Sequence, residues 1–416
     1  MKKILVISEP FYPQEVASVQ LLLDLCEDLV KAGYKVKVIT GNLTQIFNQK
    51  QNRNILRQEN YKGIEILRLR NTTFSKYRMI GRFLNYLTFH FLVLCHTLFF
   101  ERPNLVFVLS NPPFISFWGL ILKMLKRSKV IYNVQDLFPD VVVELGKLKN
   151  KLFIRFLKKI SELIIKKVDK VVVIGEYMKK RIRREYLRGT NMSNNHIVTI
   201  HNWADGGKIK VLRKDIENNF FKKKWELEGR FIVLYSGNIG YLHEFDTIIS
   251  AAECFAKEGL KEIIFVFIGE GIKKSYIKKK VKEKGLNNIL FFPYQTQEML
   301  SYSLGLTNVS LVTLEKGFEG MVVPSKIYGI LASGRPVIAV VGEESEVVEI
   351  IRKGKCGKIV KIGDYQAMVN NIMDYYKNPK KCREDGLNGR RYFEKNYERK
   401  IATEKYIKII KEVLKS

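Results

Sequence analysis

The sequence has 416 residues, 46% of them hydrophobic, which is enough for two domains of roughly 200 residues that each bury a core. Neither the composition nor the content of Gly and Pro is that of a disordered chain. The 72 Lys and Arg residues against 42 Asp and Glu give a formal net charge of +30. This surplus predicts an anionic partner such as nucleic acid, an acidic membrane or phosphorylated small molecules. A solvated, lysine-rich surface without a partner remains the alternative.

Seven short apolar runs in the first half predict the strands of one sheet, and helical patterns such as Val19–Ala32 lie between several of them. Continuously apolar strands that alternate with helices indicate a parallel sheet covered on both faces. The opening MKKILVISEPFYP belongs to this pattern, because Glu9 and Pro10 end its apolar run too early for a signal peptide. The predicted strands are Lys3–Ser8, Val36–Thr40, Ile64–Leu69, Leu105–Ser110, Lys129–Val134, Lys170–Gly175 and Ile197–Asn202.

The pattern restarts after a polar stretch, Asn202–Lys223, which we expect to contain the linker between the domains. The final stretch, Arg390–Ser416, reads as one long helix that can return to the first domain. Two Rossmann-like domains in series are therefore expected, and ligands of such sheets bind at the carboxyl ends of the strands. The second set of strands is Phe231–Gly237, Ile263–Gly269, Asn288–Pro293, Val309–Leu314, Pro336–Val341 and Gly357–Ile362.

One segment, Phe83–Phe100, has eighteen residues without Lys, Arg, Asp or Glu. A core helix explains it, and so does a helix lying in a membrane interface, with Arg70, Lys76, Arg78 and Arg82 just before it. A membrane span is the third reading, but it would interrupt the predicted sheet. The five cysteines form no CxxC pair and no zinc pattern, as is usual for a cytoplasmic protein.

Two glycine turns follow strands of the second domain. Gly237, Asn238 and Gly240 come before a helix expected over His243–Ala256, and Glu270 and Gly271 follow the next strand. Glycines allow a close backbone approach, and a helix start offers N–H groups to a phosphate. We treat these five turn residues as donor-binding candidates, although plain turns explain them too. His243 is a weaker candidate for a phosphate or sugar contact.

The loop and helix of Glu315–Val341 carry the densest set of chemical groups. Lys326, which follows Pro324 and Ser325, can neutralise a diphosphate near the helix start, and Glu319 can offset positive charge that develops on a sugar ring. A surface loop with one cap and one solvated lysine is the alternative. The chain contains no Asp-x-Asp pair, so we expect cations and helix ends, not a metal, to hold a diphosphate.

In the first domain, three loops follow predicted strands at the same carboxyl edge. They contribute Tyr12, the pair Asn111 and Pro112, and Asp136. Asp136 can act as a base or orient an acceptor hydroxyl, and capping the next turn is its structural alternative. Tyr12, Asn111 and Pro112 are the acceptor-side candidates.

In order and spacing, these motifs resemble the retaining GT-B glycosyltransferases of the group 1 or family 4 type. Within them, the chain is similar to the fucosamine-type and colanic-acid transferases of bacterial surface polysaccharides. The resemblance rests on SEPFYP with Ser18-Val19-Gln20, Asn111-Pro112-Pro113, Gln135–Asp140, His201-Asn202-Trp203, Tyr235–Gly240, Pro324-Ser325-Lys326 and Leu331–Pro336.

The resemblance implies two Rossmann-like domains facing across a cleft. Residues 1–205, with a helix over 398–416 packed back on them, would bind the acceptor, and residues 206–397 the donor. It also implies retention of anomeric configuration without a metal or other cofactor, and a nucleotide-diphosphate sugar, most often a UDP-sugar; an N-acetylated amino-deoxyhexose is one candidate. The implied acceptor is a polyprenyl-diphosphate-linked saccharide at the cytoplasmic face of an anionic membrane, in O-antigen or capsule biosynthesis, and no nucleic acid is involved.

The sequence departs from many relatives at Gly329, where they place the second of two glutamates, the one that holds the nucleotide ribose. Lys326 then takes part of the role in donor binding. Three alternatives stay open: a UDP-sugar 2-epimerase with the same fold, an inactive subunit of another transferase, and a basic nucleic-acid binder. The last lacks a recognisable motif, since the lysines of Lys273–Lys284 fit a solvated helix face.

Overall fold

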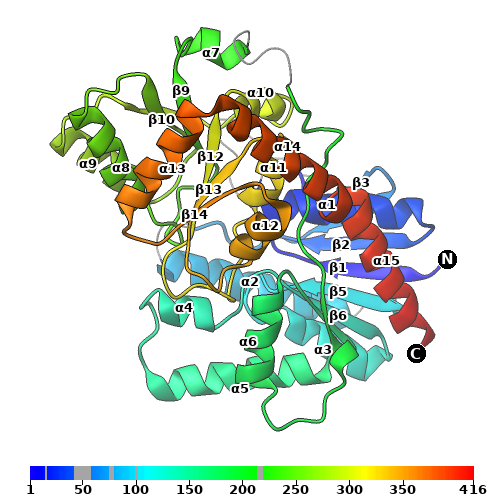
Figure 1. Cartoon of the computed structure of the whole chain (residues 1–416). Coiled ribbons are helices and arrows are strands. Elements are labelled where there is room, and N and C mark those ends of the chain that lie inside the picture. Colours follow the sequence, from blue (N-terminus) through cyan, green and yellow to red (C-terminus); the bar gives the residue numbers. More distant parts are fainter. Residues whose placement is uncertain (15, 42–57, 75–78, 99–100, 213–218) are drawn as a thin grey trace. The chain divides into compact units, whose positions relative to one another are not determined.

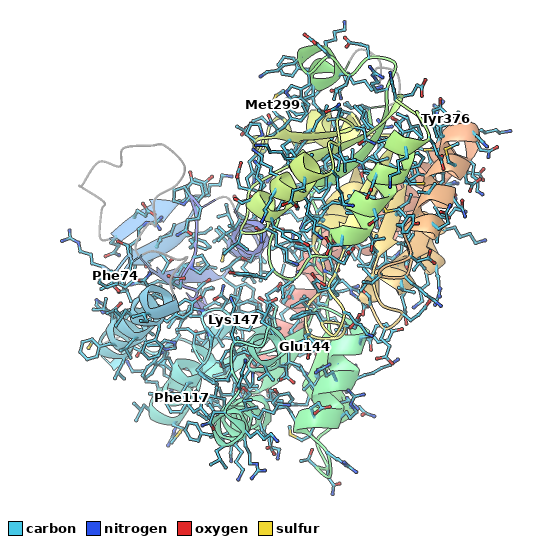
Figure 2. The ribbon with its side chains drawn as sticks, turned by 90° about the vertical axis from the view of Figure 1, so that its left-hand side faces the viewer. Phe74, Phe117, Glu144, Lys147, Met299 and Tyr376 are labelled. Carbon is cyan, nitrogen blue, oxygen red and sulfur yellow. The ribbon has the colours of Figure 1, made fainter. Side chains whose placement is uncertain are left out.

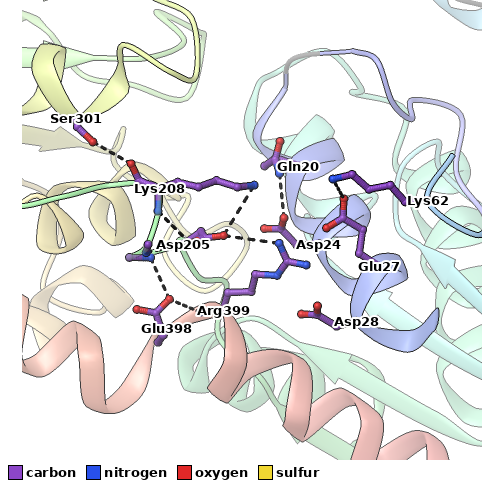
Figure 3. Close-up of polar contacts among 12 residues, drawn as sticks. Gln20, Asp24, Glu27, Asp28, Lys62, Asp205, Lys208, Ser301, Glu398 and Arg399 are labelled. Carbon is purple, nitrogen blue, oxygen red and sulfur yellow. Dashed lines mark hydrogen bonds and ion pairs between the residues drawn. The ribbon is translucent and has the colours of Figure 1, made fainter. Parts of the chain in front are cut away.

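The computed structural model describes residues 1–14, 16–41, 58–74, 79–98, 101–212 and 219–416. The chain forms two compact units (Figure 1): unit 1 is Met1–His201 with Ala402–Ser416, and unit 2 is Asn202–Ile401. Unit 2 thus begins four residues before the expected boundary. The reason is visible in Figure 3, where Glu398 accepts a hydrogen bond from the Gly206 N–H at 2.9 Å and Arg399 pairs with Asp205 at 3.6 Å.

The sheet of unit 1 has the order β3-β4-β2-β1-β5-β6-β7-β8, and every pair except β3–β4 is parallel. All seven predicted strands are present, with ends that differ by up to three residues. β3 was missed because its sequence, QENY, is polar and lies at the edge of the sheet. The strands are β1 Lys3–Ile7, β2 Lys35–Thr40, β3 Gln58–Tyr61, β4 Ile64–Arg68, β5 Leu105–Leu109, β6 Lys129–Val134, β7 Lys170–Val173 and β8 Ile197–Thr199.

One face of this sheet is covered by a layer of four helices in which neighbours touch in the order α2, α3, α5, α6. Right-handed crossovers place α1 on the opposite face, because β1 to β2 runs the other way across the sheet. The helices are α1 Ala17–Lys31, α2 Met79–Leu98, α3 Ser116–Lys126, α4 Asp140–Glu144, α5 Lys151–Lys167 and α6 Glu176–Tyr186. A short 3-10 turn, Asn194–His196, precedes β8.

The sheet of unit 2 is parallel, with the order β11-β10-β9-β12-β13-β14. All six predicted strands form, as β9 Phe231–Ser236, β10 Ile263–Ile268, β11 Ile289–Phe292, β12 Val309–Thr313, β13 Val337–Val340 and β14 Gly357–Val360. The helices of this unit are α7 Phe220–Lys224, α8 Asp246–Lys257, α9 Lys274–Glu283, α10 Leu300–Gly305, α11 Lys326–Ala332, α12 Glu346–Gly354, α13 Tyr365–Lys377 and α14 Pro379–Asn396, and the chain ends with α15 Arg399–Lys415. The expected linker, Asn202–Lys223, lies partly outside the described residues.

The C-terminal stretch read as one helix is two, because α14 ends before Tyr397 and Glu398 pairs with Ala204 in a β-bridge. Most of α15 belongs to unit 1, where the Tyr406 hydroxyl accepts a hydrogen bond from the buried Asn133 amide at 2.7 Å. Its ring also packs edge-on against Phe107. These contacts fix α15 to the face of the unit 1 sheet that α3 does not cover.

The apolar segment at Phe83–Phe100 forms most of α2, whose Phe89 and Val93 are fully buried in unit 1. Within the described ranges, no helix is long and apolar enough to cross a membrane. Lys76 and Arg78, and the end of the segment at Phe99 and Phe100, lie outside those ranges.

Candidate functional site

The glycine turn after β9 is bound directly to the loop after β10. The Gly237 N–H donates to the Ile268 carbonyl at 2.8 Å, and the Ile239 N–H donates to the Glu270 carbonyl at 2.9 Å. A Cβ on Gly269 would lie 2.0 Å from the Gly237 oxygen, and one on Gly271 would lie 2.3 Å from the Ile239 oxygen. These two glycines are therefore required by the close approach of two backbones, so the glycine content of the β10 loop has a structural cause.

Lys326, the first residue of α11, lies over this turn. A Cβ on Gly237 would lie 2.6 Å from Lys326 Cε, so any other residue there would displace the end of the lysine side chain from this position. Lys326 Nζ is 5.0 Å from the centroid of the Tyr235 ring, a cation–π distance. The Tyr235 hydroxyl donates to the Asn238 carbonyl at 2.8 Å, so the same side chain supports both the turn and the lysine.

His243 positions the head of Lys326. Its Nδ1 lies 2.9 Å from the Thr313 carbonyl, and only a protonated nitrogen can make that contact. Nε2 is then the acceptor, and Lys326 Nζ donates to it at 3.2 Å. Desolvation, followed by the nearby Lys326 charge, lowers the pKa of His243 to about 3, which keeps the ring neutral. His243 therefore holds the lysine and is not itself a cation for phosphate.

The ammonium of Lys326 is poorly compensated. Among the described residues, no carboxylate forms an ion pair with it, although the side chain is half-buried. Burial lowers the pKa of Lys326 to about 7. A desolvated cation next to a glycine turn is a site for an anion. We call Tyr235, Gly237, His243 and Lys326 the Lys326 cluster.

Two other lysines at this edge of the sheet are already paired. Lys273 binds the Glu315 carboxylate at 2.5 Å and the His243 carbonyl at 2.8 Å. Lys274 binds the candidate residue Glu270 at 2.5 Å and the Gly269 carbonyl at 2.9 Å. Glu270 thus neutralises a lysine in this structure, which is a structural role beside the donor contact predicted for it.

Glu319 lies near the end of β13. Its Oε2 accepts from the Gly317 N–H at 2.8 Å, and a Cβ on Gly342 would lie 2.1 Å from its Oε1. Because β12 separates β13 from β9, Glu319 and the Lys326 cluster belong to different sides of β12. Ser325 precedes α11, but its side chain makes no cap hydrogen bond, and the Pro324 carbonyl accepts from the Ile327 N–H at 3.3 Å.

In unit 1, Ser110 brings two neighbouring strand ends together. Its buried hydroxyl accepts from the N–H groups of Gln135 at 3.0 Å and Asp136 at 3.1 Å, which joins the end of β5 to the end of β6. The surrounding protein raises the pKa of Asp136 to about 6 by desolvation, while the exposed surface of the residue keeps it in contact with water. A carboxyl group with such a pKa can exchange a proton near neutral pH.

The other acceptor-side candidates follow β1 and β5, the strands next to β6. Tyr12 stacks on Tyr61 with ring centroids 4.1 Å apart, and its carbonyl accepts from Arg68 Nη2 at 2.6 Å. Asn111 is exposed, and its peptide bond to Pro112 is cis. The structure thus gathers Tyr12, Asn111, Pro112 and Asp136 at one carboxyl edge of unit 1, as the order of the strands requires.

Sequence reasoning missed Tyr235 as part of the site and did not recognise how His243 acts. Tyr235 lies inside an apolar run and reads as a core residue, and it is indeed fully buried. The contact between His243 and Lys326 joins residues 83 positions apart, so no local sequence pattern predicts it.

Both units match known family models. Residues 216–392 match the model for glycosyl transferases group 1, and residues 18–217 match the model for Glycosyltransferase Family 4. Among curated proteins, the chain is 27% identical over 320 residues to "Probable glycosyltransferase WbjE" of Pseudomonas aeruginosa, covering 76% of each. It is also 27% identical over 218 residues to "Putative colanic acid biosynthesis glycosyl transferase WcaI" of Escherichia coli, covering 51% of each.

Solved structures agree on the fold. Sucrose-phosphate synthase from Thermosynechococcus elongatus superposes with a TM-score of 0.76 at 16% identity over 99% of each chain. Alr3699/HepE from Anabaena, in complex with UDP, gives 0.71 at 12% identity over 99% of this chain and 100% of that one. The chain therefore has the GT-B fold. Together, the two domain matches and the curated relatives show that it is a glycosyltransferase.

Proposed function

We propose that this glycosyltransferase moves a sugar, such as an N-acetylated amino-deoxyhexose, from a UDP-sugar to a polyprenyl-diphosphate-linked saccharide, with retention of anomeric configuration and without a metal. The reaction would serve bacterial surface polysaccharide synthesis, such as O-antigen or capsule, at the cytoplasmic face of the membrane. Unit 2 would bind the donor and unit 1 the acceptor. The relative WcaI supports the polysaccharide assignment, since its name includes colanic acid biosynthesis.

The observation that carries the donor assignment is the half-buried ammonium of Lys326 beside the Gly237 turn, which forms no ion pair with any described carboxylate. A diphosphate would supply the missing negative charge, and the glycines at Gly237 and Gly240 allow its oxygens to approach the backbone around Asn238. UDP is favoured as the nucleotide because Alr3699/HepE, a protein of the same fold, is known in complex with UDP.

Two acids receive the reactive roles in this proposal. Glu319 would face the transferred sugar and offset positive charge on its ring, and Asp136 would orient the acceptor hydroxyl. The raised pKa of Asp136 suits a group that must accept a proton near pH 7. Tyr12, Asn111 and Pro112 would contact the acceptor from the neighbouring strand ends.

The first test is thermal unfolding with UDP, GDP, ADP, NAD or short single-stranded DNA, each added separately. A ligand at 100 times its Kd adds about 2.7 kcal/mol to stability. We expect a rise in Tm with UDP, its loss in Lys326→Ala, and no loss in the control Lys279→Ala, whose side chain is 76% exposed on α9. A rise with NAD or DNA alone would contradict the proposal.

The second test is turnover of a UDP-sugar with a lipid-linked acceptor in the presence of EDTA, with the anomeric configuration of the product read by NMR. We expect Glu319→Ala to lower kcat at least tenfold, equivalent to about 1.4 kcal/mol. If neither Glu319→Ala nor Lys326→Ala changes turnover or donor affinity by that factor, the site is wrongly assigned. Conversion of the UDP-sugar without acceptor would instead identify an epimerase.

A further inference from the structure

The helix α2 carries an apolar stripe that the fold of unit 1 does not use. Ile80, Leu87 and Phe91 lie seven and then four residues apart, which places them on one side of the helix, and they are 76%, 53% and 62% exposed. On the opposite side of the helix, Phe89 and Val93 are fully buried. A helix that covers one face of a sheet needs one apolar stripe, so the outer stripe requires a separate explanation.

The helix α5 repeats this arrangement, with the intervals of four and seven residues in the opposite order. Leu152, Phe156 and Leu163 are 74%, 57% and 47% exposed, while Leu157 and Ile164 are buried on the other side. Two helices of one unit thus have apolar residues both toward the core and toward solvent.

The two stripes belong to one surface, because α3 lies between α2 and α5 and contacts both. Helices in one layer bury the side that faces the sheet, so their opposite sides face the same way. α3 contributes Met124, 81% exposed, and Phe117, which is labelled in unit 1 in Figure 2. We call this face of α2, α3 and α5 the outer helix surface. Large exposed apolar areas mark contact with another apolar body.

The charge around the outer helix surface selects among possible partners. The 17 residues of α5 include six Lys or Arg and a single acid, Glu162. Arg155 and Lys159 are exposed and adjoin the stripe of Leu152, Phe156 and Leu163 on the helical wheel. Apolar side chains flanked by cations fit an anionic lipid bilayer, which offers acyl chains beneath negative headgroups. A two-fold contact between copies would instead bring the same cations together.

We propose that the outer helix surface docks unit 1 on an anionic lipid bilayer, with the apolar stripes of α2 and α5 in the headgroup region and the α5 cations on lipid phosphates. This rests on the proposed function only in that the lipid-linked acceptor lies in that bilayer. The contacts themselves follow from exposure, helix packing and charge.

The test is co-sedimentation of the full chain with vesicles of phosphatidylcholine, with or without phosphatidylglycerol. We expect binding at least tenfold stronger with phosphatidylglycerol. Two double variants, Leu87→Ser with Phe91→Ser and Phe156→Ser with Leu163→Ser, should each lower the partition coefficient at least tenfold. Arg155→Glu with Lys159→Glu should reduce binding to the level of neutral vesicles, because each basic side chain near an anionic surface contributes roughly fivefold.

The matched control is Ile272→Ser with Tyr365→Ser, which removes two exposed apolar side chains of unit 2, 39% and 43% exposed, and should leave vesicle binding unchanged. Every variant must keep the wild-type Tm and its shift with UDP, so that a folding defect is recognised. Wild-type protein that ignores phosphatidylglycerol, or outer-surface variants that bind like wild type, overturn the proposal. A dimer of the wild-type protein in light scattering, which these variants convert to monomers, would also overturn the proposal. Absence of the UDP shift in wild type contradicts the proposed function and leaves the vesicle result to stand alone.

Discussion

The affinity for UDP should fall as pH rises above 7. Burial lowers the pKa of Lys326 to about 7, so the free protein carries about half of this charge at pH 7. By the same titration, roughly one molecule in eleven keeps the proton at pH 8 and about one in a hundred at pH 9. A bound diphosphate favours the protonated form and raises its pKa, so binding takes up a proton. Affinity then falls about fivefold from pH 7 to 8 and nearly tenfold from pH 8 to 9.

Isothermal titration calorimetry at pH 7, 8 and 9 measures this slope, in buffers of different ionisation enthalpy that report the proton uptake. The terminal phosphate of UDP ionises near pH 6, so its own titration is almost complete in this window. Lys326→Ala should bind UDP weakly and with little pH dependence, while Lys279→Ala should keep the wild-type slope. A flat wild-type profile, or an equal slope in Lys326→Ala, would refute the assignment of Lys326 to the diphosphate.

Three stability predictions follow from close contacts. Gly269→Ala should destabilise by about 3 kcal/mol or more, since its Cβ would lie 2.0 Å from the Gly237 backbone oxygen; Gly285→Ala, with a positive φ and open space, should lose only about 1–2 kcal/mol in the same urea titration. Tyr406→Phe should lose about 1–3 kcal/mol, because the buried Asn133 amide loses its acceptor. Lys326→Met should raise Tm at pH 7 and raise it less near pH 10. Above the folded pKa, only the unfolded state keeps this lysine protonated, and the resulting destabilisation of the folded state shrinks as pH rises toward the unfolded pKa. An equal gain in Tm at both pH values would contradict this.

The alternation of strands and helices could be read from the sequence because each buried parallel strand is a continuous apolar run. β5, for example, is Leu-Val-Phe-Val-Leu and is buried along its whole length. β3 was not predicted because Gln58–Tyr61 lies at the sheet edge and pairs on one side only, so its residues are polar and lack an apolar run. The break between α14 and α15 was not predicted because it depends on a distant residue. Glu398 forms a β-bridge with Ala204, nearly two hundred residues away in the sequence, and the helix is interrupted there.

The sequence predicted which loops form the candidate site, but it did not predict the contacts between their side chains. The position of Lys326 after Pro324 and Ser325 placed it near the helix start, where α11 does begin. What the lysine touches depends on how the end of β9 meets α11, and that is decided by packing of the whole sheet. Gly271 shows a second limit of prediction from sequence. This glycine is needed by backbone packing, but in the sequence it looks identical to a glycine needed by a ligand.

Gly329 is the position where family resemblance and geometry can be compared most directly. The family resemblance implies a ribose-binding glutamate at this position, but a Cβ at Gly329 would point to Leu304 Cδ1 at 3.6 Å and Ile209 Cδ1 at 3.8 Å, which are ordinary contacts with apolar side chains. Gly329→Ala should therefore stabilise α11 by up to about 1 kcal/mol through helix propensity and leave UDP affinity within twofold of wild type. Urea unfolding and calorimetry measure the two quantities. A large loss of UDP affinity would mean that the ligand reaches this face of α11. The nucleotide would then fill the space that a glutamate side chain at position 329 would occupy.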